Sequence, residues 1–332
     1  MSLNRQSYKK GQKGKKRRRR IFTFVVLPIL ILLIGAGTYA GILYNKAESV
    51  MNKSYKPIER DSARAKPLTI DKTSILFIGV DDSEKRKNDG PARSDALMLA
   101  TFNKSDKSVK LLSIPRDSYV HIPEKDMYTK ITHAHAYGGV KLTLETVEEL
   151  LDIPVDYYVK MNFNAFIDVV DALGGITVDV PYTFSEQDSK DRAKAITLEK
   201  GEQTLNGEQA LALARTRKKD SDIQRGQRQQ EILKAIITKA ASVKSLNNYT
   251  DVMDAVGKNM TTDLAFDQMK SFLGYLQGGN KLNIETLTLD GADSYIDGIY
   301  YYQLDETKLE ETKQILSDHL QLTSDNTSDE TN

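Results

Sequence analysis

The chain has 332 residues, of which 39% are hydrophobic and 28% charged, a balance typical of a folded protein with one large domain or two small ones. The absence of cysteine excludes disulfide bonds, thiolate metal sites and a cysteine nucleophile. Residues 1–20 hold ten basic and no acidic side chains. The net charge of +1 is therefore the sum of a basic N-terminal segment and a remainder in which acidic residues are in excess. This distribution argues against a nucleic-acid-binding domain and predicts no nucleic-acid partner.

The first feature in chain order is an uncharged apolar segment at residues 21–44. As a helix it would reach about 35 Å, enough to cross a hydrocarbon layer of about 30 Å. The basic N-terminal segment then places residues 1–20 in the cytoplasm and the chain beyond Lys46 outside the cell membrane, as a single-pass type II protein. The alternative is a cleaved signal peptide, but the segment is long for that role and Thr38-Tyr39-Ala40 is a poor cleavage site.

Residues 45–72 are polar with weak periodicity, which predicts an extracytoplasmic stalk. The pattern changes at Ser74, where compact apolar runs bounded by turn-forming residues begin. These runs predict strands at residues 75–80, 96–102 and 109–114.

Helical and strand-like patterns alternate through the rest of the chain. Apolar spacing predicts helices at residues 143–151, 166–173, 207–213, 221–243, 264–276 and 304–320. Compact apolar runs predict strands at residues 157–161, 176–180 and 284–289. Residues 321–332 are uniformly polar, which predicts a disordered tail. The interleaving of helices and strands favours a layered α/β domain over residues 73–320.

Carboxylates and arginines flank three of the predicted strands. Asp81 comes directly after the first strand, Arg93 and Asp95 precede the second, and Arg116 and Asp117 follow the third. In an extended segment, the side chains of residues two apart point to the same side. Arg93 and Asp95 are therefore expected to point to the same side of the chain. Taken singly, an aspartate at a strand end is more often a turn former or a helix cap. The repetition at three strands favours a shared site at the edge where open α/β sheets bind ligands.

A second set of polar residues follows further along the chain. Arg215 and Arg217 are two apart, whereas Arg225, Arg228 and Gln229 are spaced to share one helix face. Such arginines usually form a solvated face. Combined with those at the strand ends, they indicate a phosphate or carboxylate site, because the planar guanidinium forms bidentate hydrogen bonds. The aspartates are expected to pair with arginines or to hold a divalent cation such as Mg²⁺, which binds carboxylates together with substrate phosphates. The set predicts a pyrophosphate site with a metal.

Nine short motifs occur in order along residues 74–233 and carry a family resemblance. They are Ile75-Leu-Phe-Ile-Gly-Val-Asp81, Arg93-Ser-Asp95, Leu112-Ser-Ile-Pro-Arg-Asp117, His133-Ala-His-Ala-Tyr-Gly-Gly139, Val155-Asp-Tyr-Tyr-Val159, Asp171-Ala-Leu-Gly-Gly175, Leu205-Asn-Gly-Glu-Gln-Ala210, Arg215-Thr-Arg217 and Arg225-Gly-Gln-Arg-Gln-Gln230. In these motifs the chain resembles the LytR–CpsA–Psr family of Gram-positive cell-wall enzymes. The resemblance thins beyond Lys239, and one departure is Gln224, where the family often has glycine.

The resemblance implies a single domain with a central mixed β-sheet flanked by helices, preceded by the membrane helix. It also implies a phosphotransferase that acts as a glycopolymer–peptidoglycan ligase. Such an enzyme moves an anionic glycopolymer, with wall teichoic acid as the leading candidate, from an undecaprenyl-pyrophosphate carrier in the membrane lipid to peptidoglycan. The acceptor group is expected to be the 6-hydroxyl of muramic acid.

The matching motifs also imply roles for individual residues. Asp81 and Asp95 are expected to hold Mg²⁺, or Mn²⁺ in its place. The residues expected to bind the pyrophosphate are Arg93, Arg116, Arg215, Arg217, Arg225, Arg228 and Gln229. The catalytic candidates are Asp81, Arg93, Asp95 and Arg116, because phosphoryl transfer depends on positioning and charge neutralisation. Either aspartate suits the role of general base, and the sequence does not choose between them.

His133 and His135 fall within one of these motifs. A catalytic or structural metal site normally needs at least three protein ligands, and the sequence offers no third one nearby. We therefore expect both histidines to pack or form hydrogen bonds at the rim of the site.

Two other functions use the same features. A hydrolase would release the polymer from its carrier with water as the acceptor, and the same site would serve it. A regulator would bind polyprenyl-pyrophosphate without chemistry, or act as a transcription attenuator. The predicted topology argues against the attenuator, since only about twenty residues would face the cytoplasm.

Overall fold

The computed structural model describes residues 41, 44–46, 48–50, 52–59, 71–80, 92–219, 222–242, 260–272 and 282–322. The chain divides into two compact units, residues 1–49 and residues 50–332. The described residues of the first unit are helical. The predicted cytoplasmic segment, nearly all of the predicted membrane helix at residues 21–44 and the tail beyond residue 322 lie outside the described residues. Within the described ranges, no helix is long and apolar enough to cross a membrane.

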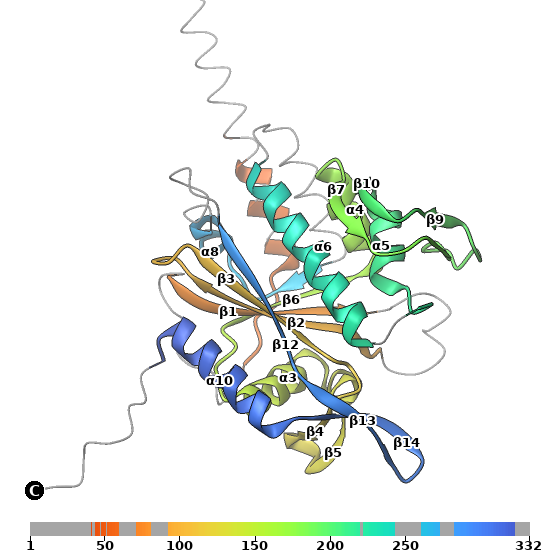
Figure 1. The fold of residues 1–332 in the computed structure, drawn as a ribbon. Coiled ribbons are helices and arrows are strands. Elements are labelled where there is room, and N and C mark those ends of the chain that lie inside the picture. Colours follow the sequence, from red (N-terminus) through yellow and green to blue (C-terminus); the bar gives the residue numbers. More distant parts are fainter. Residues whose placement is uncertain are drawn as a thin grey trace, which may run out of the picture. The chain divides into compact units, whose positions relative to one another are not determined.

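The second unit is built on a mixed six-stranded sheet with the order β11-β6-β1-β2-β3-β12 (Figure 1). Its strands are β1 (Lys72–Val80), β2 (Ser94–Asn103), β3 (Ser108–Ile114), β6 (Tyr157–Asn162), β11 (Met260–Thr262) and β12 (Asn283–Thr288). β1 pairs with β6, and β3 with β12, in parallel, whereas β2 is antiparallel to both of its neighbours. The predicted central mixed sheet is therefore confirmed, and five of its strands begin or end within a few residues of predicted ones.

The strand directions bring particular chain ends together. β1, β3, β6 and β12 run one way and β2 runs the other. The sheet end where β1 and β3 finish is therefore also where β2 begins. We call this end, with Val80, Ser94, Ile114 and Asn162, the C-terminal edge. The chain segments that carry Arg93, Asp95 and Arg116 meet the sheet at this edge.

Alternating side chains along each strand enter two cores on opposite faces of the sheet. Leu76 packs with α3 (Thr132–Leu151) and α10 (Glu306–Leu320) on one face. Ile75 packs on the other face with α6 (Asp222–Ser242) and α8 (Phe266–Ser271). Most residues of β1, β2 and β3 are buried, because helices cover both faces of the sheet.

Helix α3 is longer than predicted and contains a break. It begins at Thr132, whereas the apolar spacing predicts a start at residue 143. Gly138 and Gly139 have non-helical backbone angles, and the φ of +64° at Gly139 lies in the left-handed region that favours glycine. Because the break interrupts the helical repeat, the spacing of apolar residues does not reveal the first half of the helix. That first half carries His133 and His135.

A smaller layer packs against the far side of α6. It contains α4 (Phe163–Ala172), β7 (Ile176–Val180), β8 (Phe184–Glu186), β9 (Ile196–Leu198), β10 (Gly201–Leu205) and α5 (Gly207–Arg215). Asn206 and Gln209 form a capping box at the start of α5. The Gly207 N–H donates to Asp171, and a Cβ at Gly207 would lie 2.4 Å from the Ile167 carbonyl oxygen. Two family motifs therefore meet where α4 and α5 touch.

Two hairpins project beyond the C-terminal edge. One is β4 (Tyr119–Ile122) with β5 (Met127–Lys130), joined through the short helix η3 (Pro123–Lys125). The other is β13 (Gly291–Ile296) with β14 (Ile299–Leu304). Tyr302 of the second hairpin bridges to Ser118 at the base of the first. The sequence predicts none of these four strands.

Part of the segment predicted as a stalk contacts the sheet. Tyr55 forms a parallel bridge with Thr262 of β11. The Lys56 N–H donates to the Thr262 carbonyl, and the Tyr158 hydroxyl donates to the Lys56 carbonyl at 2.8 Å. These bonds extend the folded unit upstream of β1.

Candidate phosphate-binding site

The start of β2 contains a β-bulge at Asp95. Gly79 pairs with Ala96 and Val80 pairs with Ser94, which leaves Asp95 as an extra residue opposite β1. A bulge interrupts the alternation of side chains and re-aims them. The expectation that Arg93 and Asp95 share one side rests on regular extended alternation, and that alternation does not hold here.

Asp95 and Arg116 form an ion pair at the C-terminal edge. Arg116 Nη1 lies 2.9 Å from Asp95 Oδ1, and Arg116 Nε lies 3.4 Å from Asp117 Oδ2. The side chains of Arg116 and Asp95 are 23% and 20% exposed, so the pair is accessible to a ligand while partly shielded from water. Arg116 is paired with two carboxylates, so binding of an anion here needs further cations from other elements.

Arg225 reaches the same place from α6. Its Nη2 lies 3.5 Å from the backbone carbonyl oxygen of Asp95. The approach depends on Gly226, because a Cβ there would lie 2.5 Å from Ser113 Oγ on β3. Gln230, one turn further on, donates from Nε2 to carbonyls of both β3 and β12. The helix is therefore held against the sheet at the distance that lets Arg225 meet Asp95.

The backbone at Arg116 and Asp117 is fixed by two other elements, α3 and β14. The N–H of Thr132, at the start of α3, donates to the Arg116 carbonyl at 3.1 Å. The N–H of Tyr302, on β14, donates to the Asp117 carbonyl at 2.9 Å. The Thr132 hydroxyl also donates to the Ser94 carbonyl at 2.7 Å, which joins the starts of α3 and β2. These bonds lock the loop that carries Arg116 in one conformation.

Both histidines form hydrogen bonds at the rim of this cluster. His135 Nδ1 lies 2.7 Å from the Ala92 carbonyl oxygen and so donates to the residue before Arg93. His133 Nδ1 lies 2.9 Å from Thr129 Oγ1. Burial lowers the pKa of both rings, and nearby Arg93 lowers the pKa of His133 further. Both histidines thus form hydrogen bonds, as predicted, and the lowered pKa favours the neutral ring in each.

Arg228 and Gln229 contact backbone rather than the Asp95 cluster. Arg228 donates from Nε to the Leu213 carbonyl at 3.2 Å and from Nη2 to the Thr216 carbonyl at 2.5 Å. Gln229 Nε2 donates to the Ala214 carbonyl at 3.1 Å. These are terminal carbonyls of α5, which have no partner within that helix. The two side chains therefore cap the C-terminus of α5, where positive charge is favoured.

Arg215 and Arg217 differ from their predicted geometry. Arg215 is the last residue of α5, so the two do not lie in one extended segment. The guanidinium of Arg215 lies 4.8 Å from the Phe163 ring centre, and its Nη2 lies 3.8 Å from Asp191 Oδ1. Arg217 is exposed in the loop between α5 and α6. The structure brings together Asp95, Arg116 and Arg225, with Arg93 nearby, and places Arg215, Arg217, Arg228 and Gln229 around the end of α5.

Asp81, the other predicted metal ligand, lies outside the described residues. Of the two predicted ligands, the structure thus describes only Asp95, whose Oδ1 is bonded to Arg116. No group of three or more histidine, aspartate and glutamate side chains in the described ranges is placed to hold a metal ion. One carboxylate at an anion site fits a magnesium ion that takes its other ligands from substrate phosphate and water.

From the sequence, Asp117 was named only as one of the strand-end aspartates, and Lys130 was not singled out. Lys130 Nζ lies 2.8 Å from Asp117 Oδ1, so Asp117 joins Lys130 to Arg116. Asp117 had a signal, since it directly follows Arg116 at a strand end. Lys130 had none, because its position depends on the unpredicted β4–β5 hairpin.

The LytR_cpsA_psr family model matches residues 41–318 of the chain. The chain belongs to the LytR–CpsA–Psr family. It is 43% identical over 318 residues to the Bacillus subtilis (strain 168) polyisoprenyl-teichoic acid–peptidoglycan teichoic acid transferase TagT, which covers 93% of this chain and 98% of the relative. It is 37% identical over 317 residues to the transferase TagU of the same organism, covering 94% of this chain and 99% of the relative.

One solved structure of this LytR–CpsA–Psr family is TagT with bound octaprenyl pyrophosphate lipid. It is 40% identical, covers 81% of this chain and 99% of its own, and superposes with a TM-score of 0.63. The similarity confirms the family fold of a mixed sheet with flanking helices. Because the named relatives are transferases acting on teichoic acid, the family membership supports a role in wall glycopolymer transfer.

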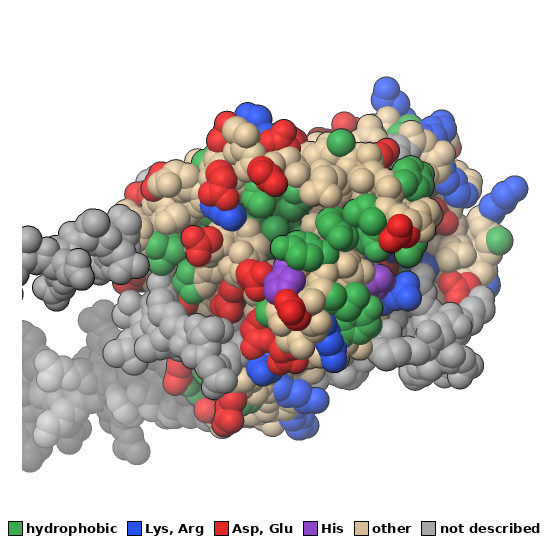
Figure 2. Space-filling model, turned by 90° about the horizontal axis from the view of Figure 1, so that it is seen from below, with side chains coloured by type: hydrophobic (Ala, Val, Ile, Leu, Met, Phe, Trp, Pro, Cys, Tyr) green, Lys and Arg blue, Asp and Glu red, His purple; other side chains and the backbone are tan. Residues whose placement is uncertain are grey.

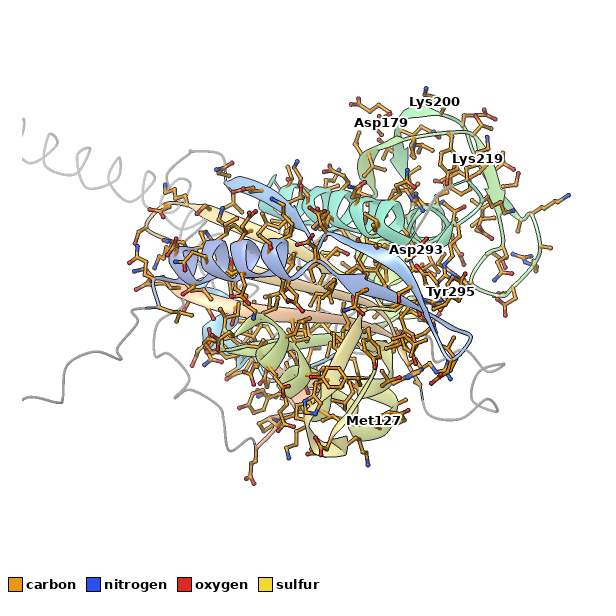
Figure 3. All side chains as sticks on the ribbon, turned by 60° about the horizontal axis from the view of Figure 1, so that its bottom comes forward. Met127, Asp179, Lys200, Lys219, Asp293 and Tyr295 are labelled. Atoms are coloured by element: carbon orange, nitrogen blue, oxygen red, sulfur yellow. The ribbon has the colours of Figure 1, made fainter. Side chains whose placement is uncertain are left out.

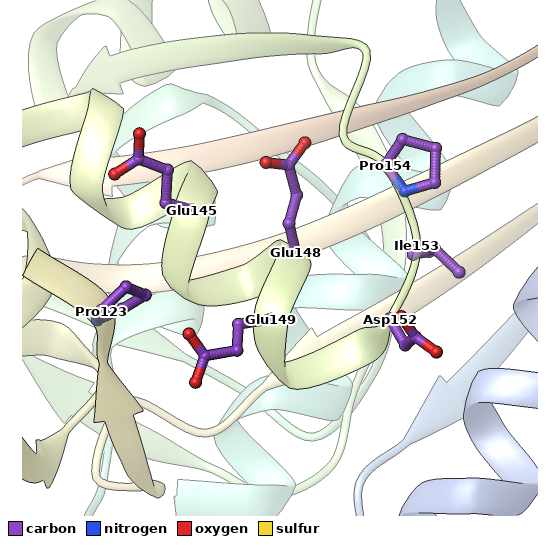
Figure 4. Close-up of a pocket in the computed structure, with 7 residues that line it drawn as sticks. All are labelled: Pro123, Glu145, Glu148, Glu149, Asp152, Ile153 and Pro154. Carbon is purple, nitrogen blue, oxygen red and sulfur yellow. The ribbon is translucent and has the colours of Figure 1, made fainter. Parts of the chain in front are cut away.

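Two hollows of this LytR–CpsA–Psr chain lie apart from the Asp95 cluster. A hollow of about 560 Å³ is bounded by glutamates on the last turns of α3 (Figure 4), but Glu148 and Glu149 already bond Val155 and His121. A groove of about 1160 Å³ runs along α6, and its lining includes Arg228 but not Arg225. The two arginines of the family motif at residues 225–230 therefore face different surroundings.

Proposed function

We propose that this protein is an extracytoplasmic phosphotransferase. It moves an anionic glycopolymer, of which wall teichoic acid is the best candidate, from an undecaprenyl-pyrophosphate carrier to peptidoglycan. The observation that carries the proposal is the convergence of Asp95, Arg116 and Arg225 from three separate elements at one edge of the sheet. The names of the relatives, which join a polyisoprenyl carrier, teichoic acid and peptidoglycan, support this substrate class.

The reaction needs charge neutralisation more than covalent catalysis. An oxygen of the acceptor hydroxyl attacks the phosphorus that carries the polymer, and the bond from that phosphorus to the bridging pyrophosphate oxygen breaks. The polymer is then joined to the acceptor by a phosphodiester, the carrier leaves as its monophosphate, and the hydroxyl proton passes to a base. Negative charge grows on the bridging oxygen, so fixed guanidinium groups beside it lower the barrier.

The structure suits Arg116 and Arg225 to that task. Arg116 is held through its backbone and by two carboxylates, and Arg225 is buried against the sheet. Groups that are already oriented need no reorganisation when the charge develops. Arg93 is exposed near His133, and we assign it to the outer phosphate.

A magnesium or manganese ion held by Asp81 and Asp95 is part of the proposal. When bound, such an ion would neutralise charge on the pyrophosphate. We expect Asp95→Ala and Asp81→Ala to abolish magnesium-dependent transfer while circular dichroism shows a folded protein. Transfer rates of both variants are measured against magnesium concentration. An unchanged magnesium dependence of the residual rate would contradict the metal assignment.

The function is tested with full-length protein in detergent, a synthetic lipid-pyrophosphate glycopolymer and peptidoglycan oligomers. A covalent polymer–peptidoglycan product establishes transfer. Free phosphorylated polymer instead establishes hydrolysis, and binding of the donor without any product favours a regulator. Arg116→Ala serves as the inactive control.

The proposed location is tested on intact protoplasts. Added protease should remove the chain beyond Lys46 and spare the N-terminal basic segment with its membrane helix. Immunoblotting with antibodies to the two ends distinguishes the outcomes. Protection of the C-terminal end would overturn the extracytoplasmic location.

A further inference from the structure

A group of tyrosines covers the two hairpins next to the Asp95 cluster. We call it the tyrosine platform; its members are Tyr119, Tyr128, Tyr295, Tyr300 and Tyr301. Tyr128 is 60% exposed and Tyr295 is 72% exposed, although large aromatic side chains are normally buried. Figure 2 shows hydrophobic side chains gathered on this face beside two histidines, with acidic side chains next to them. Figure 3 places Met127 on one hairpin and Tyr295 on the other.

The rings of the platform form two contacting groups, because Tyr300 and its neighbour Tyr301 point to opposite faces of β14. Tyr119 stands 5.6 Å from Tyr128 and 4.8 Å from Tyr301, measured between ring centres. Tyr295 and Tyr300 are 5.7 Å apart across the β13–β14 pair. Lys130 Nζ lies 5.5 Å from the Tyr300 ring and 5.7 Å from the Tyr301 ring, which joins the two groups. Rings that already pack on their neighbours lose little freedom when a ligand binds them.

The platform is continuous with the candidate phosphate site. Lys130 contacts two of its rings and also pairs with Asp117, which pairs with Arg116. The backbone gives a second connection, because the Tyr302 N–H on β14 donates to the Asp117 carbonyl. A molecule lying on the platform would therefore have one end beside Arg116.

The charges around the platform select the kind of molecule. Its rim carries more carboxylates than cations: Glu124, Asp126, Glu149, Asp293 and Asp297 against Lys125 and Lys141, of which Lys141 pairs with Glu124. The Lys130 ammonium is already paired with Asp117. An anionic polymer or an anionic lipid surface would be repelled by this rim. A sugar chain suits it on both counts, because its hydroxyls donate to carboxylates and the C–H faces of its rings stack on aromatic faces.

We propose that the tyrosine platform binds the glycan backbone of the acceptor polysaccharide and presents its hydroxyl to the arginine cluster. This inference rests on the proposed function for the identity of the acceptor as peptidoglycan. The chemistry it claims is narrower, namely a carbohydrate strand held by tyrosine rings on two hairpins. The polymer donor would approach from elsewhere, since the acidic rim disfavours it.

The first test compares acceptor kinetics of full-length variants. In Tyr128→Ala/Tyr295→Ala we expect the KM for peptidoglycan oligomers to rise about tenfold, because each aromatic contact is worth roughly a two- to tenfold change in affinity. The kcat and the KM for the lipid donor should stay within about twofold. Tyr128→Phe/Tyr295→Phe keeps both rings and should retain the wild-type KM. Ile315→Ala, at an exposed apolar residue on α10, is the matched control. An unchanged acceptor KM in the double alanine variant overturns the inference.

The second test measures binding without catalysis. Full-length protein is sedimented with peptidoglycan sacculi stripped of teichoic acid, and hydrogen exchange is followed at residues 119–130 and 291–302. Protection of both hairpins that is lost in the double alanine variant supports the platform, even if no transfer is detected and the proposed function fails. Equal binding by both proteins overturns it. So does protection of the hairpins by lipid vesicles alone, which would make the platform a membrane contact.

Discussion

Arg225 and Arg228 stand one turn apart on α6 and are almost equally buried, at 6% and 8% exposure, yet they belong to different regions of the molecule. Arg225 reaches the Asp95 carbonyl at the sheet edge, beside Arg116. Arg228 donates two hydrogen bonds to the last carbonyls of α5. The two residues share residue type, helix face and burial, so none of these properties tells a ligand-binding arginine from a structural one. Their hydrogen-bond partners do: Arg225 lies at the proposed ligand site, whereas Arg228 holds α5 and α6 together.

The largest effect is expected at Arg116, which belongs entirely to the first region. Arg116→Ala removes a fixed cation from the place where charge develops, and the transfer rate should fall about 10²–10³-fold. The thermal midpoint should change little, because the side chain is partly exposed and its backbone bonds remain. Single-turnover transfer and calorimetry measure the two quantities. A loss of less than about threefold would remove Arg116 from the site.

Arg225 tests the comparison on the helix itself. Arg225→Lys keeps the charge and loses the planar fork, so transfer should fall about ten- to a hundredfold. The free energy of unfolding should fall less than in the matching Arg228 variant. The comparison fails if Arg225→Lys transfers at the wild-type rate.

Arg228→Lys should show the opposite pattern. A lysine cannot satisfy both the Leu213 and Thr216 carbonyls, so the free energy of unfolding should drop by about 1–2 kcal/mol. Transfer per folded molecule should stay within about threefold. If Arg228 instead bound the pyrophosphate, Arg228→Lys would reduce transfer as much as Arg225→Lys does. Urea unfolding monitored by circular dichroism gives the stability. A large rate loss with unchanged stability would place Arg228 in the ligand site, as the family motif predicts.

The smallest effect concerns a buried histidine far from the site. Burial lowers the pKa of His319, whose ring nitrogens lie 2.8 Å from Thr101 Oγ1 and from Ser108 Oγ. The native state then binds fewer protons than the unfolded chain, so stability is complete above the ordinary histidine pKa of about 6.5 and falls as the pH drops below it. For one group the slope stays below about 1.4 kcal/mol per pH unit.

His319→Gln should flatten this acid loss of stability, as measured by urea unfolding between pH 7 and pH 5. His121 is the internal control, because Glu149 and Asp126 raise its pKa and its contribution has the opposite sign. His121→Gln should therefore steepen the acid loss. An unaltered pH dependence in His319→Gln would show that other groups control it.

The middle of the sheet was predictable because most residues of its strands β1, β2 and β3 are buried. β1 and β2 contain compact apolar runs and β3 is apolar except for Lys110 and its serines, as expected of strands covered on both faces. Helix α6 was predictable to within one residue at each end, since it keeps its periodicity from Asp222 to Ser242. From these elements alone, the polar residues after β3 and before β2 could be expected at one edge, and the Asp95–Arg116 pair fulfils that expectation.

What could not be predicted depends on contacts between distant parts of the chain. The hairpin β4–β5 has only four residues per strand, too few for a clear alternation, so Lys130 gave no signal. The bulge at Asp95 is set by the register with β1 and leaves no mark in the residues around it. The split between Arg225 and Arg228 follows from where α5 ends, which lies two residues beyond the predicted helix.

The bond from the Tyr302 N–H to the Asp117 carbonyl joins two parts of the chain that are made at very different times. Residues 116 and 117 leave the ribosome well before Tyr302 does. Until Tyr302 is made, the loop that carries Arg116 lacks one of its backbone supports, and the hairpin that bears Tyr295 is incomplete. A chain terminated before residue 302 would contain Asp95, Arg116 and Arg225 without the bond that holds the Asp117 carbonyl. The proposed activity is thereby coupled to synthesis of the chain through residue 302.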